Sequence, residues 1–184
     1  MADLITLAEY KTYKGINSSQ HDTRISDIIT KVSALIKNYC NRTFVDYASI
    51  DKVEYFRYIP EDGNLLLSEF PLISVSYVLT SSDGGVTQTD MDEDDDYFVD
   101  TQEDMLVFPT VPSTEGFKAF EVKYKGGYTT LPEDLKLCTI NMVDYFRDEE
   151  FTSKKQSMNT IIEYSSAKLP YHMKRTLDLY RVIL

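Results

Sequence analysis

The most regular pattern in the chain is a series of apolar residues that recur every three or four positions between Ile25 and Cys40. The series is Ile25, Ile28, Ile29, Val32, Leu35, Ile36, Tyr39 and Cys40. An apolar stripe with this 3.6-residue period predicts an amphipathic α-helix. Asp22 falls in its first turn, where a negative charge interacts favourably with the helix dipole, and Asn41-Arg42 marks its end.

A short helix is predicted before this one. Thr6 and Glu9 have the spacing of a capping box, in which each residue accepts a hydrogen bond from the backbone of the other. Gly15 closes the helix after about Lys14, because glycine readily adopts the left-handed conformation that ends a helix.

Two further helices are predicted in the last third of the chain. The first runs from Pro132 to about Asp148 and carries a stripe of Leu135, Cys138, Met142, Tyr145 and Phe146. Ile140 and Val143 lie off this stripe, so the apolar surface is wide enough for contacts on two sides. The second runs from Pro170 to about Ile183, and the segment between the two helices, Phe151 to Ser166, is predicted to be a loop or a mobile arm.

The terminal helix has two open interpretations. Its apolar face is formed by Leu169, Met173, Leu177, Tyr180 and Leu184, and its other positions include the basic or titratable residues His172, Lys174, Arg175 and Arg181. It is either a core helix with a solvated face or a segment that docks onto a partner by helix-in-groove packing. Removing the helix would distinguish them, because the loss of a core helix would also unfold the rest.

The middle of the chain changes to the two-residue period of β-strands. Short strands are predicted for Ile50 to Tyr58, Leu65 to Leu67, Val75 to Thr80, Tyr97 to Val99, Leu106 to Phe108 and Lys118 to Tyr124. The last is the clearest, since Phe120, Val122 and Tyr124 alternate with charged residues. Turn signals at Gly63-Asn64 and Asp83-Gly84-Gly85 separate the strands and favour an antiparallel sheet or sandwich.

Together these elements predict an α+β fold of about four helices around an inserted antiparallel β unit. We expect a single domain over residues 1–184. Its parts are a helical segment at 1–45, the β unit at 46–128, a helix at 129–150, and a loop or arm with the C-terminal helix at 151–184.

Charge is the feature of composition that most restricts function. The chain has 184 residues and a net charge of −11, with 30 acidic against 19 basic side chains. Binding to nucleic acid is driven by basic residues that release counterions from phosphates, so this chain is a poor candidate for gripping DNA or RNA. No apolar run is long enough to cross a bilayer, and the N-terminus lacks the features of a signal peptide, so we expect a cytoplasmic site of synthesis.

The densest charge is an acidic run of Asp90, Asp92, Glu93, Asp94, Asp95 and Asp96. A calcium loop that began at Asp92 would have Glu103 at its twelfth position, but Tyr97 stands where such a loop needs glycine. A solvated hairpin tip is the favoured interpretation. A functional negative surface, which repels DNA or docks a basic partner, remains the alternative.

No catalytic motif is present. Cys40 and Cys138 lie on apolar helix faces and are interpreted as reduced core thiols, although spacing alone leaves a bridge between them open. His21 and His172 are expected at the surface. Gly126-Gly127 lacks the lysine and third glycine of a phosphate-binding loop and instead predicts a turn with positive φ or close backbone approach. We expect no cofactor and no metal.

Two stretches resemble the head–tail connector (head-completion, adaptor) proteins of tailed bacteriophages. The first is Leu4-Ile5-Thr6-Leu7-Ala8-Glu9-Tyr10-Lys11, followed by Ile16 and by Asn38-Tyr39-Cys40-Asn41-Arg42-Thr43-Phe44. The second is Gly126-Gly127-Tyr128 with Leu131-Pro132-Glu133-Asp134-Leu135-Lys136. The resemblance covers about two thirds of the chain, and the β region from Ile50 to Lys118 is longer than in compact members of the family.

The resemblance implies a non-enzymatic virion protein that is assembled in the host cytoplasm. Such proteins form a ring, usually twelve-fold, beneath the portal protein; they extend the DNA channel and offer a platform to the next neck or tail protein. DNA passes without specific binding. In this family the C-terminal segment tends to reach the portal, and a loop of the β region tends to approach the lumen.

These expectations give three sets of candidate residues. The portal-binding candidates are His172, Lys174, Arg175, Tyr180 and Arg181. The acidic run from Asp90 to Asp96 is the candidate for a lumen-facing loop. Ile140, Val143 and Tyr145 are the subunit-contact candidates. The alternatives are another neck or tail-completion protein on a related scaffold and an acidic metal-dependent hydrolase.

Overall fold

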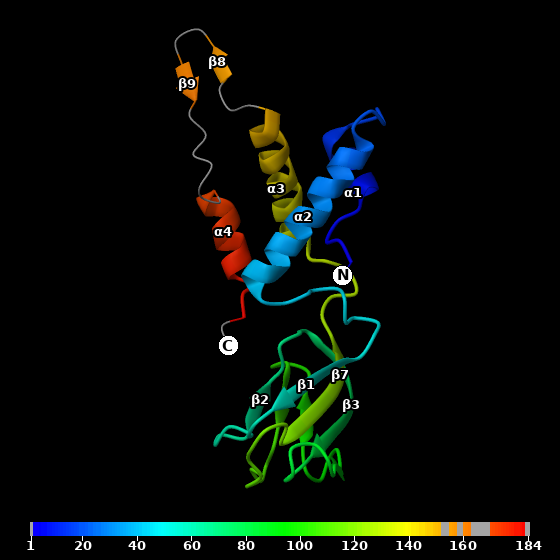
Figure 1. Ribbon diagram of the computed structural model, residues 1–184, viewed down its shortest axis with the longest axis vertical. Helices are drawn as coiled ribbons and strands as arrows, with labels where there is room; N and C mark the ends of the chain where they lie inside the picture. Colours follow the sequence, from blue (N-terminus) through cyan, green and yellow to red (C-terminus); the bar gives the residue numbers. More distant parts are fainter. Residues whose placement is uncertain (1, 152–154, 158–159, 163–169, 183–184) are drawn as a thin grey trace. The chain divides into compact units, whose positions relative to one another are not determined.

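The structure is a computed structural model that describes residues 2–151, 155–157, 160–162 and 170–182 (Figure 1). Its backbone contacts divide the chain into two compact units. The helical unit consists of Met1–Arg42 and Leu131–Leu184, and the β unit consists of Thr43–Thr130. The α+β class is confirmed, and the inserted β unit begins and ends within three residues of its predicted bounds. The single-domain interpretation stays a prediction.

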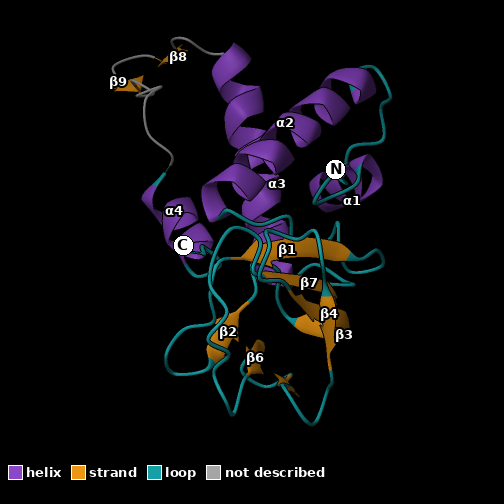
Figure 2. Cartoon of the chain, turned by 60° about the horizontal axis from the view of Figure 1, so that its bottom comes forward, coloured by secondary structure: helices purple, strands orange, loops and turns teal. Residues whose placement is uncertain are grey.

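In the described part of the helical unit there are four helices and one pair of short strands. They are α1 (Leu7–Lys14), α2 (Asp22–Cys40), α3 (Glu133–Phe151), α4 (Tyr171–Asp178), β8 (Lys155–Ser157) and β9 (Thr160–Ile162). Figures 1 and 2 show α2 and α3 packed side by side, with α4 near the C-terminal end of α2. β8 and β9 pair antiparallel.

The ends of α1 and α2 follow the predicted signals. Thr6 Oγ1 accepts the N–H of Glu9 at 3.2 Å, and the Glu9 carboxylate accepts the N–H of Thr6 at 2.7 Å, which completes the capping box. Gly15 ends α1 at φ +65°, and Asn41 ends α2 in the same left-handed region. Along α2 the predicted stripe is buried at Ile25, Ile28, Ile29, Val32, Ile36 and Cys40.

The β unit contains two antiparallel sheets. The four-stranded sheet has the order β1 (Lys52–Phe56), β7 (Phe120–Gly126), β3 (Leu72–Thr80) and β4 (Thr89–Met91). The three-stranded sheet has the order β2 (Asn64–Leu66), β6 (Met105–Val107) and β5 (Phe98–Asp100). β7 pairs with both β1 and β3, and two register irregularities interrupt β3.

Both sheets contribute to one hydrophobic core. Phe120, Val122 and Tyr124 of β7 are fully buried in it, together with Leu65 of β2 and Leu106 of β6. The charged residues that alternate with them on β7 are only partly buried. The sandwich interpretation is therefore correct, and the two-residue period of β7 identified its inner face.

The Gly126-Gly127 pair is a site of close backbone approach, as expected. Gly127 has φ +105°, and a Cβ atom there would lie 2.3 Å from the carbonyl oxygen of Phe44. A Cβ atom at Gly126 would lie 2.3 Å from the carbonyl oxygen of Glu69. A side chain at either position would collide with backbone, so the fold requires glycine at both.

Three elements differ from the prediction. β4 was not predicted, because its sequence Thr-Asp-Met lacks an alternating pattern. α4 ends at Asp178 rather than near Ile183, since the N–H of Val182 donates to the carbonyl of Cys40 at 3.0 Å instead of continuing the helix. The segment predicted as a loop or arm contains the end of α3 and the strands β8 and β9; its remaining residues lie outside the described ranges.

Candidate functional site

α4 is attached to the helical unit by its apolar face. Leu177 is fully buried and Met173 is 7% exposed. The Cys40 thiol donates a hydrogen bond to the carbonyl oxygen of Leu177 at 3.5 Å. The Cys138 thiol donates one to the carbonyl oxygen of Met173 at 3.8 Å. This packing agrees with the interpretation of a core helix that has a solvated face.

The five portal-binding candidates separate into two groups. His172, Lys174 and Arg175 are exposed on α4, and the Arg175 guanidinium lies 5.7 Å from the ring centre of Tyr171. Tyr180 instead donates to the Asp134 carboxylate at 2.7 Å, and the exposed Arg181 lies over the ring of Tyr39.

The Tyr180 and Arg181 contacts hold the two residues against α3 and α2, respectively. Tyr39 of α2 also donates to Asp178 at 2.5 Å, which adds a further link between α2 and α4. The basic surface that α4 presents to solvent is therefore centred on His172, Lys174 and Arg175.

The acidic run forms an exposed turn between the two sheets rather than a hairpin tip. Asp90 is on β4 of one sheet, and the turn leads into β5 of the other. The Asp92 N–H donates to Asp96 Oδ2 at 2.9 Å, and the Asp96 N–H donates back to the Asp92 carbonyl at 2.8 Å. All five acidic side chains from Asp92 to Asp96 are exposed.

Tyr97 anchors this turn in the core of the β unit. Its side chain is 3% exposed and its ring centre lies 6.0 Å from that of Phe108. Burial, and then the nearby charges of Glu93 and Asp92, raise the pKa of the Tyr97 phenol. Tyr97, which stands where a calcium loop would need glycine, thus has a structural role in the core of the β unit.

Within the described ranges, no group of three or more His, Cys, Asp or Glu side chains is arranged to hold a metal ion. The same ranges contain no helix with the length and hydropathy that a membrane span requires. His21 and His172 are both exposed, as predicted.

The two thiols are buried and free, which confirms their interpretation as reduced core residues. Burial raises the pKa of Cys40 to about 12 and that of Cys138 to about 11. Because the thiolate is the reactive form of cysteine, both are poor nucleophiles and poor metal ligands at neutral pH.

The subunit-contact candidates on α3 lie mostly in the interior. Val143 is fully buried and Ile140 is 6% exposed, so these side chains pack within the helical unit and present almost no surface to another subunit. The wide apolar surface of α3 reflects internal contacts on two sides. Tyr145 is partly buried, with its ring 5.6 Å from that of Phe146 in an edge-on arrangement.

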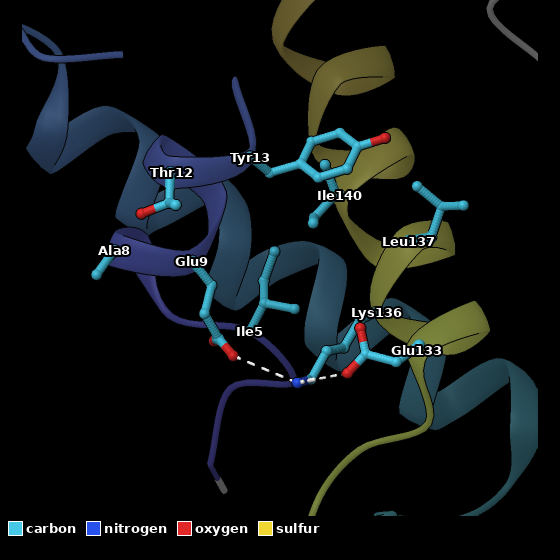
Figure 3. A pocket seen from close by; sticks show the side chains of 9 residues that line it. All are labelled: Ile5, Ala8, Glu9, Thr12, Tyr13, Glu133, Lys136, Leu137 and Ile140. Carbon is cyan, nitrogen blue, oxygen red and sulfur yellow. Dashed lines mark hydrogen bonds and ion pairs between the residues drawn. The ribbon is translucent and has the colours of Figure 1, made fainter. Parts of the chain in front are cut away.

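The structure brings together a groove that the sequence analysis did not identify. It lies between α1 and α3 and is lined by Ile5, Ala8, Glu9, Thr12, Tyr13, Glu133, Lys136, Leu137 and Ile140 (Figure 3). Tyr13 is 57% exposed and Leu137 is 42% exposed. At 100° per residue, Leu137 lies about 200° around the helix from Leu135 of the predicted stripe. An apolar residue so far from the stripe was the sequence signal that could have revealed this second surface.

The described residues thus form an α+β fold with an inserted β sandwich, an exposed acidic turn and an exposed basic surface on α4. The sequence of the chain matches the model of the head completion protein family over residues 3–183. The chain belongs to this family, which confirms the resemblance seen in its N-terminal and Gly126-Gly127 stretches.

Known proteins agree with this assignment. The chain is 22% identical to the head completion protein of Escherichia phage T5 over 181 residues, which are 97% of this chain and 98% of the relative. Its fold is similar to a chain in the neck of an empty gene transfer agent (GTA) particle, computed with C6 symmetry. The TM-score is 0.64 at 12% identity, over 98% of this chain and 91% of the other.

A chain in the neck of the native GTA particle, computed with C12 symmetry, has a TM-score of 0.60 at 11% identity. That similarity covers 97% of this chain and 88% of the other. At these identities the two similarities establish a shared fold.

Proposed function

We propose that this chain is a structural protein of the virion neck, and that its copies form a ring between the portal and the tail. The observation that carries the proposal is the head completion family match, which spans both units of the chain. The head completion protein of phage T5 is similar over nearly its whole length. The fold similarity to neck chains in particles computed with C6 and C12 symmetry supports a ring, twelve-fold in our proposal.

In this ring the chain extends the DNA channel, and the acidic turn faces the lumen. The charge of −11 and the exposed carboxylates from Asp92 to Asp96 support this arrangement. A negative lumen repels the phosphates of packaged DNA, so the DNA can slide without being held by counterion release. A ring repeats each lumen-facing carboxylate once in every copy.

The basic surface of α4 is our candidate for the portal contact. His172, Lys174 and Arg175 are exposed on a helix that Met173 and Leu177 attach to the rest of its unit. A partner can therefore bind these side chains without first displacing the helix. The opposite side of the ring offers a platform to the next neck or tail protein.

We propose no catalytic role and no cofactor. Membership in the head completion family and the high pKa values of both thiols support this view. A thermal-shift screen with divalent cations separates it from the metal-dependent hydrolase alternative. We expect no large rise in melting temperature, whereas strong stabilisation by one cation would favour the hydrolase.

Electron microscopy of particles with and without the chain tests the main proposal. Particles that contain it should show a ring of density on the portal, and particles that lack it should lose that ring and their tails. Particles whose portal carries no ring of this chain would refute the proposal.

The portal contact is tested by reversing charges on α4. Lys174→Glu with Arg175→Glu should abolish co-sedimentation with portal complexes without changing the melting temperature, because both side chains are exposed. Lys31→Glu, which alters an exposed lysine on α2, is the matched control and should still bind. Unchanged binding by the α4 variant would exclude this surface.

A further inference from the structure

The groove between α1 and α3 is an apolar surface that the described residues of its unit leave unfilled. It has a volume of about 440 Å³, within the range of pockets that bind side chains and small ligands. Figure 3 shows the Tyr13 ring extending from α1 toward Leu137 and Ile140 of α3. The exposed Tyr13 and Leu137 side chains form its apolar walls.

The rim of the groove carries excess negative charge. Lys136 Nζ lies 3.6 Å from Glu9 Oε1 and 3.2 Å from Glu133 Oε1, so one ammonium group stands between two carboxylates. The hydrogen bond to Glu133, and then the charges of Glu133 and Glu9, raise the pKa of Lys136 and outweigh the opposing effect of desolvation. The Glu133 side chain is 86% exposed and remains accessible to a second cation.

The β unit carries an exposed apolar surface with an adjacent positive charge, which complements the apolar groove and its negative rim. We call this surface the Phe117 knob and define it as Val86, Phe117 and Lys118. Val86 is 85% exposed and Phe117 is 68% exposed. Their two loops lie against each other, since a Cβ atom at Gly84 would be 3.8 Å from Phe117 Cδ1. Lys118 Nζ lies 5.6 Å from the centre of the Phe117 ring, which places a positive charge beside the apolar tip.

Hydrogen bonds hold the knob in shape. The Asp83 carboxylate accepts the N–H groups of Val86 and Thr87, at 3.0 and 2.8 Å. The N–H of Ser81 donates to the carbonyl of Ala119 at 2.8 Å, which ties the two loops together. A large aromatic side chain exposed to water beside a second exposed apolar residue is typical of an interaction surface.

We propose that the groove of one copy receives the Phe117 knob of a neighbouring copy. Phe117 enters the space between Tyr13 and Leu137, and the Lys118 ammonium meets the Glu133 carboxylate at the rim. Groove and knob belong to different units, so the contact is heterologous and can repeat around a closed ring. This inference rests on the proposed ring and assigns its subunit contact to the groove, which Ile140 lines with the small part of its side chain that is exposed, whereas Val143 is fully buried and takes no part.

Cross-linking in assembled particles tests the contact directly. The variant Phe117→Cys with Leu137→Cys, treated with a bismaleimide, should give a ladder of multimers. Cys40 and Cys138 should add little background, because both are buried thiols with raised pKa values. Phe117→Cys with Leu179→Cys is the matched control, since Leu179 is 78% exposed and lies outside the groove; it should give no ladder.

Each other outcome overturns the docking proposal. A dimer from Leu137→Cys alone would mean that two grooves face each other, and a heterogeneous product would mean that another virion protein fills the groove. A ring that is visible by electron microscopy in particles that give no ladder would remove this contact and leave the ring intact. Wild-type particles without the ring would overturn the proposed function as well.

A charge exchange provides an independent test. Lys118→Glu and Glu133→Lys should each reduce the fraction of particles with a ring, and the double variant should restore it, because the exchange recreates the opposite charges. All three should stay folded. The melting temperature should fall slightly wherever Glu133→Lys is present, because that change removes the ion pair with Lys136 and a favourable negative charge from the first turn of α3. If the double variant assembles no better than the single variants, these two side chains do not meet.

Discussion

The hydroxyl of Tyr10 on α1 donates a hydrogen bond to Asp144 Oδ1 on α3 at 2.6 Å. The two residues are 134 positions apart in the sequence, and Tyr10 is fully buried. Arg147 donates to the same tyrosine oxygen at 2.9 Å, and Lys14 forms an ion pair with Asp144. This network connects the two helices that line the groove.

Removing the Tyr10 hydroxyl should therefore loosen the attachment of α1. Tyr10→Phe leaves Asp144 and Arg147 with one hydrogen bond fewer in a partly buried site, and we expect the free energy of unfolding to fall by about 1–3 kcal/mol. Urea denaturation followed by circular dichroism measures the change. Tyr13→Phe removes a hydroxyl from an exposed side chain on the same helix and should have little effect; equal losses in both variants would contradict the role of the network.

Two glycine substitutions should differ in their effect on stability. Gly127→Ala places a Cβ atom 2.3 Å from the Phe44 carbonyl oxygen at a φ of +105°, and we expect a loss of about 3 kcal/mol. Gly15→Ala also has positive φ but meets nothing within 4 Å, so its loss should be about 1 kcal/mol. Thermal denaturation of both variants checks the order, and a milder effect at Gly127 would show that backbone movement relieves the collision.

The packing of α4 should control access to the thiols. Leu177→Ala removes a fully buried side chain, and large-to-small core substitutions of this type cost about 2–5 kcal/mol. Because Cys40 and Cys138 contact the carbonyls of Leu177 and Met173, their reaction with a thiol reagent should become faster.

Leu179→Ala is the control for this experiment, because the Leu179 side chain is 78% exposed. It should leave the thiols as protected as in the wild type. If the thiols of Leu177→Ala also stay protected, then α4 does not shield them.

The loop that supports Val86 should depend on pH. Hydrogen bonds from the backbone and side chain of Thr87, and then from Ser81 and Val86, lower the pKa of Asp83 to about 2. A carboxyl whose pKa is depressed in the folded state stabilises the fold fully above its unfolded pKa of roughly 3.9, and this contribution is lost as the pH falls toward 2.

We therefore expect the amide signals of Val86 and Thr87 to lose their native chemical shifts between about pH 4 and pH 2. NMR titration of the intact chain measures this. Asp83→Ala should show the altered signals already at neutral pH, while Asp95→Ala, at an exposed acid of the acidic turn, should not. Native shifts in Asp83→Ala would show that other contacts order the loop.

Local signals in the sequence predicted the elements that short-range physics controls. The capping box at Thr6 and Glu9, the α2 stripe and the alternation on β7 each depend on residues at most a few positions apart, and all three are confirmed. The signal fails where backbone pairing alone decides the structure. β4 is a strand because its backbone pairs with β3 from Val78 to Thr80, although its own residues show no strand pattern.

The sequence by itself determined the α+β class, the burial of the two thiols and the family. Only the tertiary structure decided which face of α3 is interior, that α1 and α3 enclose a groove, and that Val86 and Phe117 stand together on the β unit. The physical reason is that a periodic pattern indicates which apolar residues are favourably buried. It does not indicate which part of the molecule, or which partner, covers them. Ile140 finds that partner within its own unit, whereas Leu137, three residues earlier on the same helix, stays 42% exposed.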